Sequence, residues 1–262
     1  MEGRYIVELL RIENLTKSFP KKKGLVLKDI DLSIIEGEIF GLVGESGCGK
    51  STLARAILRL IDIDRGKIFY NKEDLVPLSN KKMKVLRKDL QVIFQDPYSS
   101  LNPRMRVGDI LKEVFMIHSS YLNKELRFKA VELLESVGLG ESHINRLPRE
   151  LSGGEKQRVV IARTLATDPR FIVCDEPVSS LDISIQAQIL NLLMDLQKKK
   201  NLTYLFISHD INVIASICDR VGVMCKGEIV EIGAVEEVFK NPNHIYTKEL
   251  LDSSSFTALR SI

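Results

Sequence analysis

The spacing of apolar residues changes along the chain between the two-residue period of strands and the wider period of helices, which predicts an α/β fold. Residues 9–15 and 26–34 predict strands, and the second has apolar residues at every second position, as in a strand with one buried face. Residues 39–43, IFGLV, are an apolar run long enough for a buried strand and too short for a free-standing helix. Further strands are predicted at residues 67–76, 90–94, 171–176 and 202–207, with a strand pair at 220–232.

Helical spacing dominates the middle of the chain. Residues 107–117, 124–137 and the stretch that begins at Leu151 predict helices, whereas QDPYSSLNP from Gln95 onward is dense in turn formers and predicts a loop. Other helices are predicted around residues 80–88 and 180–199. We therefore expect a helical subdomain at 95–165, an α/β core at 1–94 and 166–240, and an irregular tail at 241–262.

A glycine-rich segment, GESGCGKST, joins the predicted strand 39–43 to a predicted helix and matches the phosphate-loop pattern. Its three glycines leave the backbone free to turn, so that successive amides can point inward at phosphate oxygens. Lys50 would lie between the outer phosphates, and Ser51 would offer its hydroxyl to Mg²⁺. A bare glycine turn before a helix is the alternative, but it does not explain a lysine and a hydroxyl at these positions. The residues predicted to bind a nucleoside triphosphate here are Gly44, Glu45, Ser46, Gly47, Cys48, Gly49, Lys50, Ser51 and Thr52.

Composition narrows the class of protein. The 262 residues suffice for one large domain or a domain with a subdomain, and 38 Lys and Arg against 35 Asp and Glu leave a net charge of +3, too balanced to indicate a nucleic-acid partner. No apolar run approaches the roughly 20 residues that span a bilayer, and residues 1–15 lack a signal-peptide pattern. The cysteines at positions 48, 174, 218 and 225 have no metal-ligand spacing, so we expect reduced thiols in the cytoplasm.

Polar residues at the ends of two predicted buried strands are candidates for chemistry. Asp175 and Glu176 follow an apolar run and precede a proline, and such an acidic pair suits one carboxylate for magnesium and the next for polarising water. A charged strand end facing solvent is the alternative. His209 follows the strand 202–207 at the edge where ligands bind in open α/β sheets. His118 and His143 have no partners at ligand spacing, and we interpret them as surface or core-edge residues.

The segment LSGGE opens a helix with a recognisable start. Ser152 is a good N-cap, and the two glycines after it leave amides exposed at the positive end of the helix. Considered alone, the segment is compatible with an ordinary helix start. Phe19, in a polar loop between the first two strands, would likewise be interpreted alone as a core-edge residue.

Taken in chain order, these motifs resemble an ATPase of the ABC transporter family. The resemblance rests on the phosphate loop, Gln95, LSGGE at 151–155, CDE at 174–176, SSLD at 179–182 and His209. It covers nearly the whole chain, and LSGG at this separation from a phosphate loop is highly specific. It implies ATP and Mg²⁺ as cofactors, and a phosphate-loop α/β core that carries an antiparallel β subdomain and a helical subdomain.

The resemblance also implies roles at the chain's own nucleotide. Phe19 resembles the aromatic residue that stacks on adenine. Gln95 resembles the glutamine that touches magnesium and the attacking water and relays to the membrane subunits, and Asp175 resembles the acid on the magnesium side. Glu176 is implied as the general base and His209 as the switch that contacts the outer phosphate.

A second group of residues is implied to act across a dimer of ATPase subunits. The segment that would contact the partner's nucleotide consists of Ser152, Gly153, Gly154 and Glu155. Asp182 would lie at the dimer seam, and Glu155 stands where the family often has glutamine. Peptide and nickel importers commonly pair two different ATPase chains, and this chain has one cassette, so the resemblance implies a heterodimer with a sister ATPase.

Two further segments, FQDPYSSLNPR at 94–104 and NPNHIYTKELL at 241–251, are similar to the peptide and nickel importer branch, with Ile245 where that branch commonly has proline. The resemblance implies an ATPase subunit at the cytoplasmic face of the membrane, bound to two permease subunits that receive substrate from an external binding protein. Peptide import is the first expectation, and nickel or metal-chelate import the alternative. A soluble phosphate-loop kinase would lack LSGG and SSLD, and a non-transport ABC protein usually has two cassettes or a long coiled coil.

Overall fold

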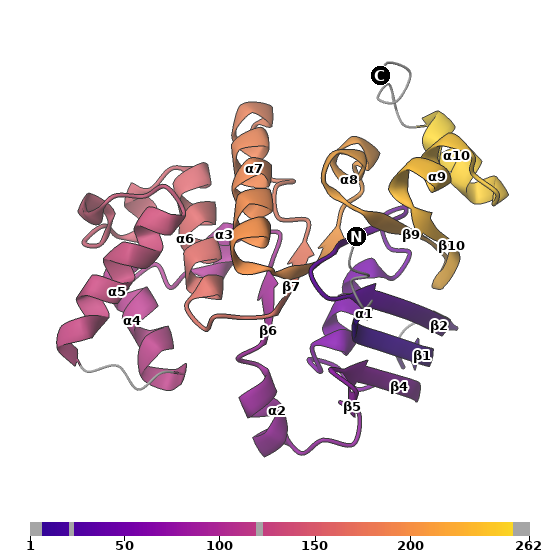
Figure 1. The fold of residues 1–262 in the computed structure, drawn as a ribbon, viewed down its shortest axis with the longest axis horizontal. Coiled ribbons are helices and arrows are strands. Elements are labelled where there is room, and N and C mark those ends of the chain that lie inside the picture. Colours follow the sequence, from indigo (N-terminus) through magenta and orange to yellow (C-terminus); the bar gives the residue numbers. More distant parts are fainter. Residues whose placement is uncertain (1–6, 21–23, 119–122, 254–262) are drawn as a thin grey trace, which may run out of the picture. The chain divides into compact units, whose positions relative to one another are not determined.

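The computed structural model describes residues 7–20, 24–118 and 123–253, which form two compact units (Figure 1). The described parts of Met1–Val85 and Lys200–Ile262 make up the first unit, and those of Leu86–Lys199 make up the second. The lysines at 21–23 and the last part of the predicted tail, 254–262, lie outside the described residues. The predicted boundaries at 94/95 and 165/166 stay predictions.

An antiparallel sheet forms one layer of the first unit. Its strands, in the order β2-β1-β4-β5, are β1 (Glu8–Ser18), β2 (Leu25–Ile35), β4 (Arg65–Tyr70) and β5 (Glu73–Asp74). Ile12 of β1 lies opposite Leu32 on one side and Ile68 on the other, and all three side chains are buried. The alternating apolar positions of the sequence thus give this sheet one face for the core.

The same unit contains a mixed set of strands around the predicted phosphate-loop strand. These strands are β3 (Ile39–Val43), β8 (Thr203–Ile207), β9 (Arg220–Cys225) and β10 (Glu228–Ala234). β3 pairs in parallel with β8 on one side and β9 on the other, and β10 pairs antiparallel with β9. Every residue of β3 and β8 is buried, as expected for the continuous apolar runs of parallel strands.

A half-buried ion pair fixes the start of β3. Glu38 accepts a hydrogen bond from the Ile35 amide at 2.6 Å and lies 3.1 Å from a guanidinium nitrogen of Arg220 on β9. Burial raises the pKa of Glu38, and the Ile35 amide and Arg220 oppose that rise. β3, the strand that precedes the phosphate loop, is therefore held to β9 by this ion pair as well as by backbone hydrogen bonds.

Five helices accompany these strands in the chain: α1 (Lys50–Ile57), α2 (Asn80–Leu86), α8 (Ile211–Ile217), α9 (Val235–Lys240) and α10 (Ile245–Ser253). The prediction of an irregular tail is wrong for α10. A nine-residue helix is marginal by local propensity, and its first turn is stabilised by tertiary bonds to Glu231 of β10. Those bonds involve a residue of another element, so the local sequence alone does not indicate them.

The second unit is mainly helical around a parallel strand pair, β6 (Leu90–Ile93) and β7 (Phe171–Asp175). Its helices are α3 (Pro97–Ser100), α4 (Val107–His118), α5 (Asn123–Ser136), α6 (Gly153–Leu165) and α7 (Ile183–Lys200), with two short 3₁₀ turns, Glu141–His143 and Pro148–Glu150. α4, α5 and α6 pack on one another (magenta to pink in Figure 1). The predicted fold class, an α/β protein with an antiparallel β subdomain and a helical part, is confirmed.

The segment after Gln95 is a one-turn helix, α3, where the sequence predicts a loop. Asp96 caps it by accepting a hydrogen bond from the Tyr98 amide at 2.8 Å, and Pro97 occupies the first helical position. Proline is favourable there because that position needs no amide hydrogen and the ring presets φ. The residues that indicated a turn are thus the start signal of a short helix.

Candidate nucleotide-binding site

The glycine-rich segment forms a tight loop between β3 and α1, and two of its glycines cannot be replaced without moving backbone. Gly44 has a φ of 151°, and a Cβ there would come within 2.1 Å of the Met224 carbonyl oxygen. Gly49 has a φ of 121°, and a Cβ there would lie 3.0 Å from the Val26 carbonyl oxygen. Gly47 also has a positive φ, 81°, but its Cβ position meets no atom within 4 Å. The loop is packed at its two ends and open in the middle.

Lys50 lies inside this loop. Its ammonium donates hydrogen bonds to the Gly44 and Glu45 carbonyl oxygens at 2.7 and 3.0 Å, and the residue is only 6% exposed. Its third contact is with Cys48 Sγ at 3.8 Å, a weak acceptor that a phosphate oxygen would readily replace. Ser51 is exposed in the first turn of α1, beside the lysine. A lysine enclosed by a glycine loop, next to a hydroxyl at the start of a helix, is compatible with phosphate binding.

Phe19 lies at the end of the first strand, half-buried. The Lys17 ammonium is 5.2 Å from the centroid of its ring, and Lys17 also pairs with Asp64 at 3.2 Å. Asp64 accepts further hydrogen bonds from the Ser18 hydroxyl and amide at 2.6 and 2.7 Å, and these bonds lower its pKa. Asp64 thus holds the segment that carries Phe19. Sequence reasoning missed it, because the two segments are far apart along the chain.

His209 lies at the same edge of the strands as the phosphate loop. β3 and β8 are parallel neighbours, and the Ser208 amide donates to the Leu42 carbonyl at 3.3 Å. The Ser208 hydroxyl accepts from the Asp210 amide at 3.0 Å, and Asp210 caps α8. His209 is exposed. The turn that carries it is held on one side by the Ser208 bond to β3 and on the other by the Asp210 cap of α8.

In the second unit, Gln95 and the acidic pair follow adjacent parallel strands. β6 and β7 are paired from Leu90 and Phe171 onward, so Gln95 and Asp175 come at the same edge. Asp175 is buried and Gln95 exposed. The Gln95 carbonyl accepts a hydrogen bond from the Ser180 hydroxyl at 3.4 Å.

The backbone at Glu176 is unusual. Its φ is 51°, in the left-handed region, which is uncommon for residues other than glycine. The Glu176 carbonyl accepts from the Ser179 hydroxyl at 3.1 Å, and the next carbonyl, of Pro177, accepts from the fully buried Gln157 amide at 2.7 Å. Gln157 lies on α6, so the LSGG helix braces the segment that follows the acidic pair. No local pattern in the sequence indicates this contact.

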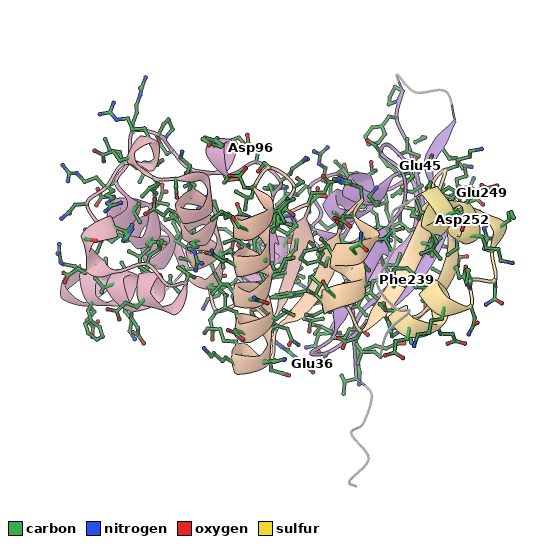
Figure 2. The ribbon with its side chains drawn as sticks, turned by 90° about the horizontal axis from the view of Figure 1, so that it is seen from above. Glu36, Glu45, Asp96, Phe239, Glu249 and Asp252 are labelled. Carbon is green, nitrogen blue, oxygen red and sulfur yellow. The ribbon has the colours of Figure 1, made fainter. Side chains whose placement is uncertain are left out.

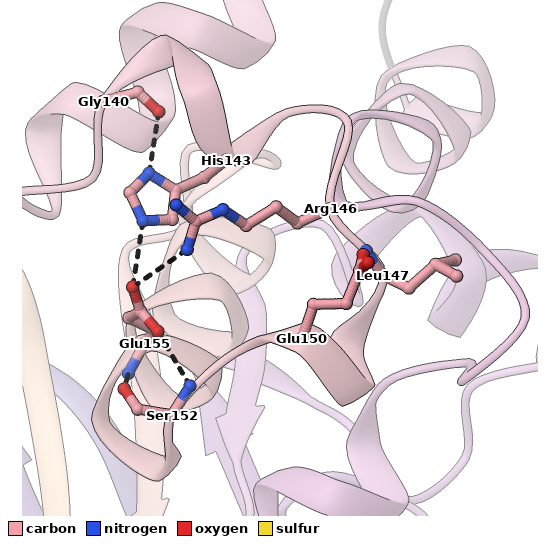
Figure 3. Close-up of polar contacts among 7 residues, drawn as sticks. All are labelled: Gly140, His143, Arg146, Leu147, Glu150, Ser152 and Glu155. Atoms are coloured by element: carbon pink, nitrogen blue, oxygen red, sulfur yellow. Dashed lines mark hydrogen bonds and ion pairs between the residues drawn. The ribbon is translucent and has the colours of Figure 1, made fainter.

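The predicted helix start at Ser152 is confirmed and is a capping box. The Ser152 hydroxyl accepts from the Glu155 amide at 3.2 Å, and the Glu155 carboxylate accepts from the Ser152 amide at 2.7 Å (Figure 3). The other Glu155 oxygen lies 3.0 Å from His143 Nε2 and 3.4 Å from Arg146. The Ser152 amide chiefly, and then His143, lower the pKa of Glu155. His143 is thus a partner of the LSGGE segment, reached by folding of the intervening turns.

Two contacts tie α6 to α3. The Lys156 ammonium lies 4.1 Å from the centre of the Tyr98 ring, and the Arg163 guanidinium donates to the Ser100 carbonyl at 2.7 Å. Asp96, which caps α3, is labelled in Figure 2. The segment after Gln95 and the LSGG helix therefore form one connected piece within the second unit.

Beside that piece lies a groove of about 640 Å³ whose lining includes Phe94, Ser100, Val114, Ile117, Val160 and Arg163. Ile117 is 59% exposed and Phe94 is 37% exposed. Its lining thus includes aliphatic side chains and the guanidinium of Arg163.

These features define a phosphate-loop nucleotide-binding protein. A family model described as ABC transporter matches residues 27–179, and the chain belongs to the ABC transporter family. It is an ABC ATPase, as the motifs predict. Within the described ranges, 7–20, 24–118 and 123–253, no helix is both long and apolar enough to cross a membrane.

Similar proteins support the same family. The oligopeptide transport ATP-binding protein OppF of Bacillus subtilis is 50% identical over 250 residues, which cover 94% of this chain and 82% of that protein. The dipeptide transport ATP-binding protein DppF of Lactococcus lactis is 48% identical over 252 residues, covering 94% and 81%. Among solved structures, cbiO1 of Clostridium perfringens, part of the ABC transporter complex cbiONQ, matches with a TM-score of 0.80 at 29% identity, covering 89% of this chain and 91% of that one. A dimer of the ATP-binding cassette MJ0796 with ADP and Pi has a TM-score of 0.77 at 29% identity, covering 86% and 98%.

Proposed function

We propose that this chain is the ATP-hydrolysing subunit of a membrane importer for oligopeptides or dipeptides. The observation that carries the proposal is the 50% identity, over 94% of the chain, to an oligopeptide transport ATP-binding protein. The dipeptide relative at 48% identity supports the same substrate class. Peptide is therefore proposed ahead of nickel or a metal chelate.

ATP is proposed to bind with its phosphates on residues 44–52 and its adenine on Phe19. The positive φ values of the loop glycines and the buried Lys50 ammonium suit an anion. Across the part of the chain that the structure describes, no three His, Cys, Asp or Glu residues gather so that they could hold a metal ion. Ser51, Gln95 and Asp175 are proposed to bind Mg²⁺ that arrives with the phosphates. A hydroxyl, an amide oxygen and one carboxylate are suitable donors, because this ion usually takes only one or two carboxylates from the protein. Bound Mg²⁺ would neutralise phosphate charge.

For hydrolysis, Glu176 is proposed as the general base that takes a proton from the attacking water. His209 is proposed to contact the outer phosphate, and Gln95 to orient the water. The capped turn that carries His209 and the braces behind Glu176 support these roles, because acid–base groups need fixed positions. Burial raises the pKa of neighbouring Cys174, so its thiol stays protonated.

Partner subunits follow from the same family membership. The helix start at 152–155 and Asp182 are proposed to face the nucleotide and seam of a sister ATPase, as a heterodimer. The groove next to α3 is proposed to receive a cytoplasmic segment of a permease subunit, which would hold the chain at the inner face of the membrane. A permease pair and an external binding protein would complete the importer.

The test is uptake of labelled peptide and of labelled nickel in cells that lack this chain and carry it back as wild type, Glu176→Gln or the control Glu236→Gln. Glu236 is an exposed acid on α9. Peptide uptake restored by wild type and the control, and not by Glu176→Gln, is the expected result. Uptake of nickel alone would contradict the proposed substrate class. Cysteines in 97–104 should crosslink to permease loops, and crosslinks confined to other proteins would contradict the docking role.

A further inference from the structure

The segment Asn241–Ser253, outside every role assigned so far, reaches the phosphate loop through one side chain. The Tyr246 hydroxyl accepts a hydrogen bond from the Glu45 backbone amide at 3.1 Å. In Figure 2, Glu45 lies on the same side of this unit as α10, on which Glu249 and Asp252 are labelled. The contact therefore joins the start of the loop to the last described helix of the chain.

The position of Tyr246 is fixed from β10. The Glu231 carboxylate accepts three hydrogen bonds from the segment, from the Asn243 amide at 2.8 Å, the His244 amide at 3.1 Å and the Thr247 hydroxyl at 2.6 Å. Burial acts to raise the pKa of Glu231, but these bonds outweigh it and lower that pKa, so the carboxylate is ionised at neutral pH. Charge-assisted bonds of this kind are the stronger class.

A local bond completes the turn. His244 Nδ1 accepts from the Tyr246 amide at 3.1 Å, and Thr247 is completely buried. The tyrosine is thus held by its own backbone on one side and by its neighbour on the other. Burial raises the pKa of Tyr246, so the hydroxyl is neutral and suited to accept from an amide.

The peptide group that Tyr246 holds also binds the lysine of the phosphate loop. The Glu45 amide donates to Tyr246, and the carbonyl of the same peptide group, that of Gly44, accepts from Lys50 at 2.7 Å. The Glu45 carbonyl, in the next peptide group, accepts from Lys50 at 3.0 Å. A rotation at Glu45 would therefore move a carbonyl partner of Lys50.

We propose that Tyr246 is a positioning residue of the nucleotide site, which holds the Glu45 peptide, and through it Lys50, in the conformation that receives phosphate. Glu231 acts through Tyr246 by anchoring the segment. The inference rests on nucleotide binding at this loop and is independent of the transported substrate.

The experiment measures the affinity of the purified chain for a fluorescent ATP analogue, together with the KM and kcat of hydrolysis. Tyr246→Phe removes one oxygen and should weaken binding about 3- to 10-fold, the range for one neutral hydrogen bond. KM should rise with kcat nearly unchanged. The affinities for ATP and GTP should fall by the same factor, because contacts to the phosphates and not to the base are affected. Affinity within twofold of wild type, while Lys50→Ala abolishes binding, would overturn the inference and leave the nucleotide site intact.

A double-mutant cycle separates positioning from a general loss of stability. Glu231→Gln should lower the affinity for ATP less than Tyr246→Phe does. The double variant should bind ATP no more weakly than Tyr246→Phe alone, because both substitutions act through one bond. Thr247→Val removes an anchoring hydroxyl and should lower the affinity for ATP. Thr247→Ser keeps the hydroxyl and should leave that affinity unchanged. Additive effects, or equal effects of the two Thr247 variants, would show that α10 does not position the loop.

Discussion

Glu155 offers a direct test of how the LSGG helix is held, because its carboxylate has three partners. Glu155→Ala removes the acceptor for the Ser152 amide, a hydrogen bond to a charged group of the kind worth about 1.5–3 kcal/mol. The His143 hydrogen bond and the Arg146 ion pair involve partly exposed side chains, and such contacts add at most about 1 kcal/mol. We expect Glu155→Ala to cost about 2–3 kcal/mol, and Glu155→Gln, which keeps an oxygen acceptor, about 1 kcal/mol.

The assay is denaturant unfolding followed by circular dichroism, with thermal unfolding as a second measure. A loss of about 2 kcal/mol should lower Tm by roughly 4–8 °C in a chain of this size. A loss below 0.5 kcal/mol for Glu155→Ala, on the order of an ordinary surface substitution, would refute the reasoning.

The pH dependence gives an independent check of the same bonds. The pKa of Glu155 is lowered from its ordinary value of 4.5, so its stabilisation is fully present above that value and is lost as the pH falls through the lower folded value. The difference in unfolding free energy between wild type and Glu155→Ala should therefore shrink in acid. A difference that grows below pH 4.5 would contradict the assignment.

Four further predictions follow from the two units. Phe19→Ala should weaken ATP binding by about 1–3 kcal/mol, and Phe19→Tyr should hardly change it, as measured by nucleotide titration. Glu176→Gln should bind ATP normally and slow turnover by about 10²–10⁴-fold in a steady-state ATPase assay. Gly44→Ala should cost at least about 2 kcal/mol in unfolding free energy, because its Cβ would overlap a backbone oxygen at a positive φ. Arg220→Met should cost about 3 kcal/mol by leaving Glu38 buried and unpaired, and adding Glu38→Gln should restore part of that loss.

The sequence by itself determined the parts of this protein that depend on neighbouring residues. The apolar run 39–43, the glycine loop and the helical spacing after it predict strand, phosphate loop and helix, and the structure has all three. The Ser152 cap and the carboxylates at the end of β7, Asp175 and Glu176, were equally visible, because a cap and a strand end are local features. The order of these motifs was sufficient to indicate the ABC transporter family.

Only the tertiary structure decided which distant side chains support those motifs. Tyr246 meets Glu45, and Asp64 holds the segment of Phe19, although the partners of each pair are far apart in sequence. The helix α10 was missed for the same reason, since Glu231 stabilises its first turn from another strand. Such bonds form when the core packs, and the core is set by the whole apolar pattern. Their partners therefore follow from the folded backbone and cannot be deduced from local spacing.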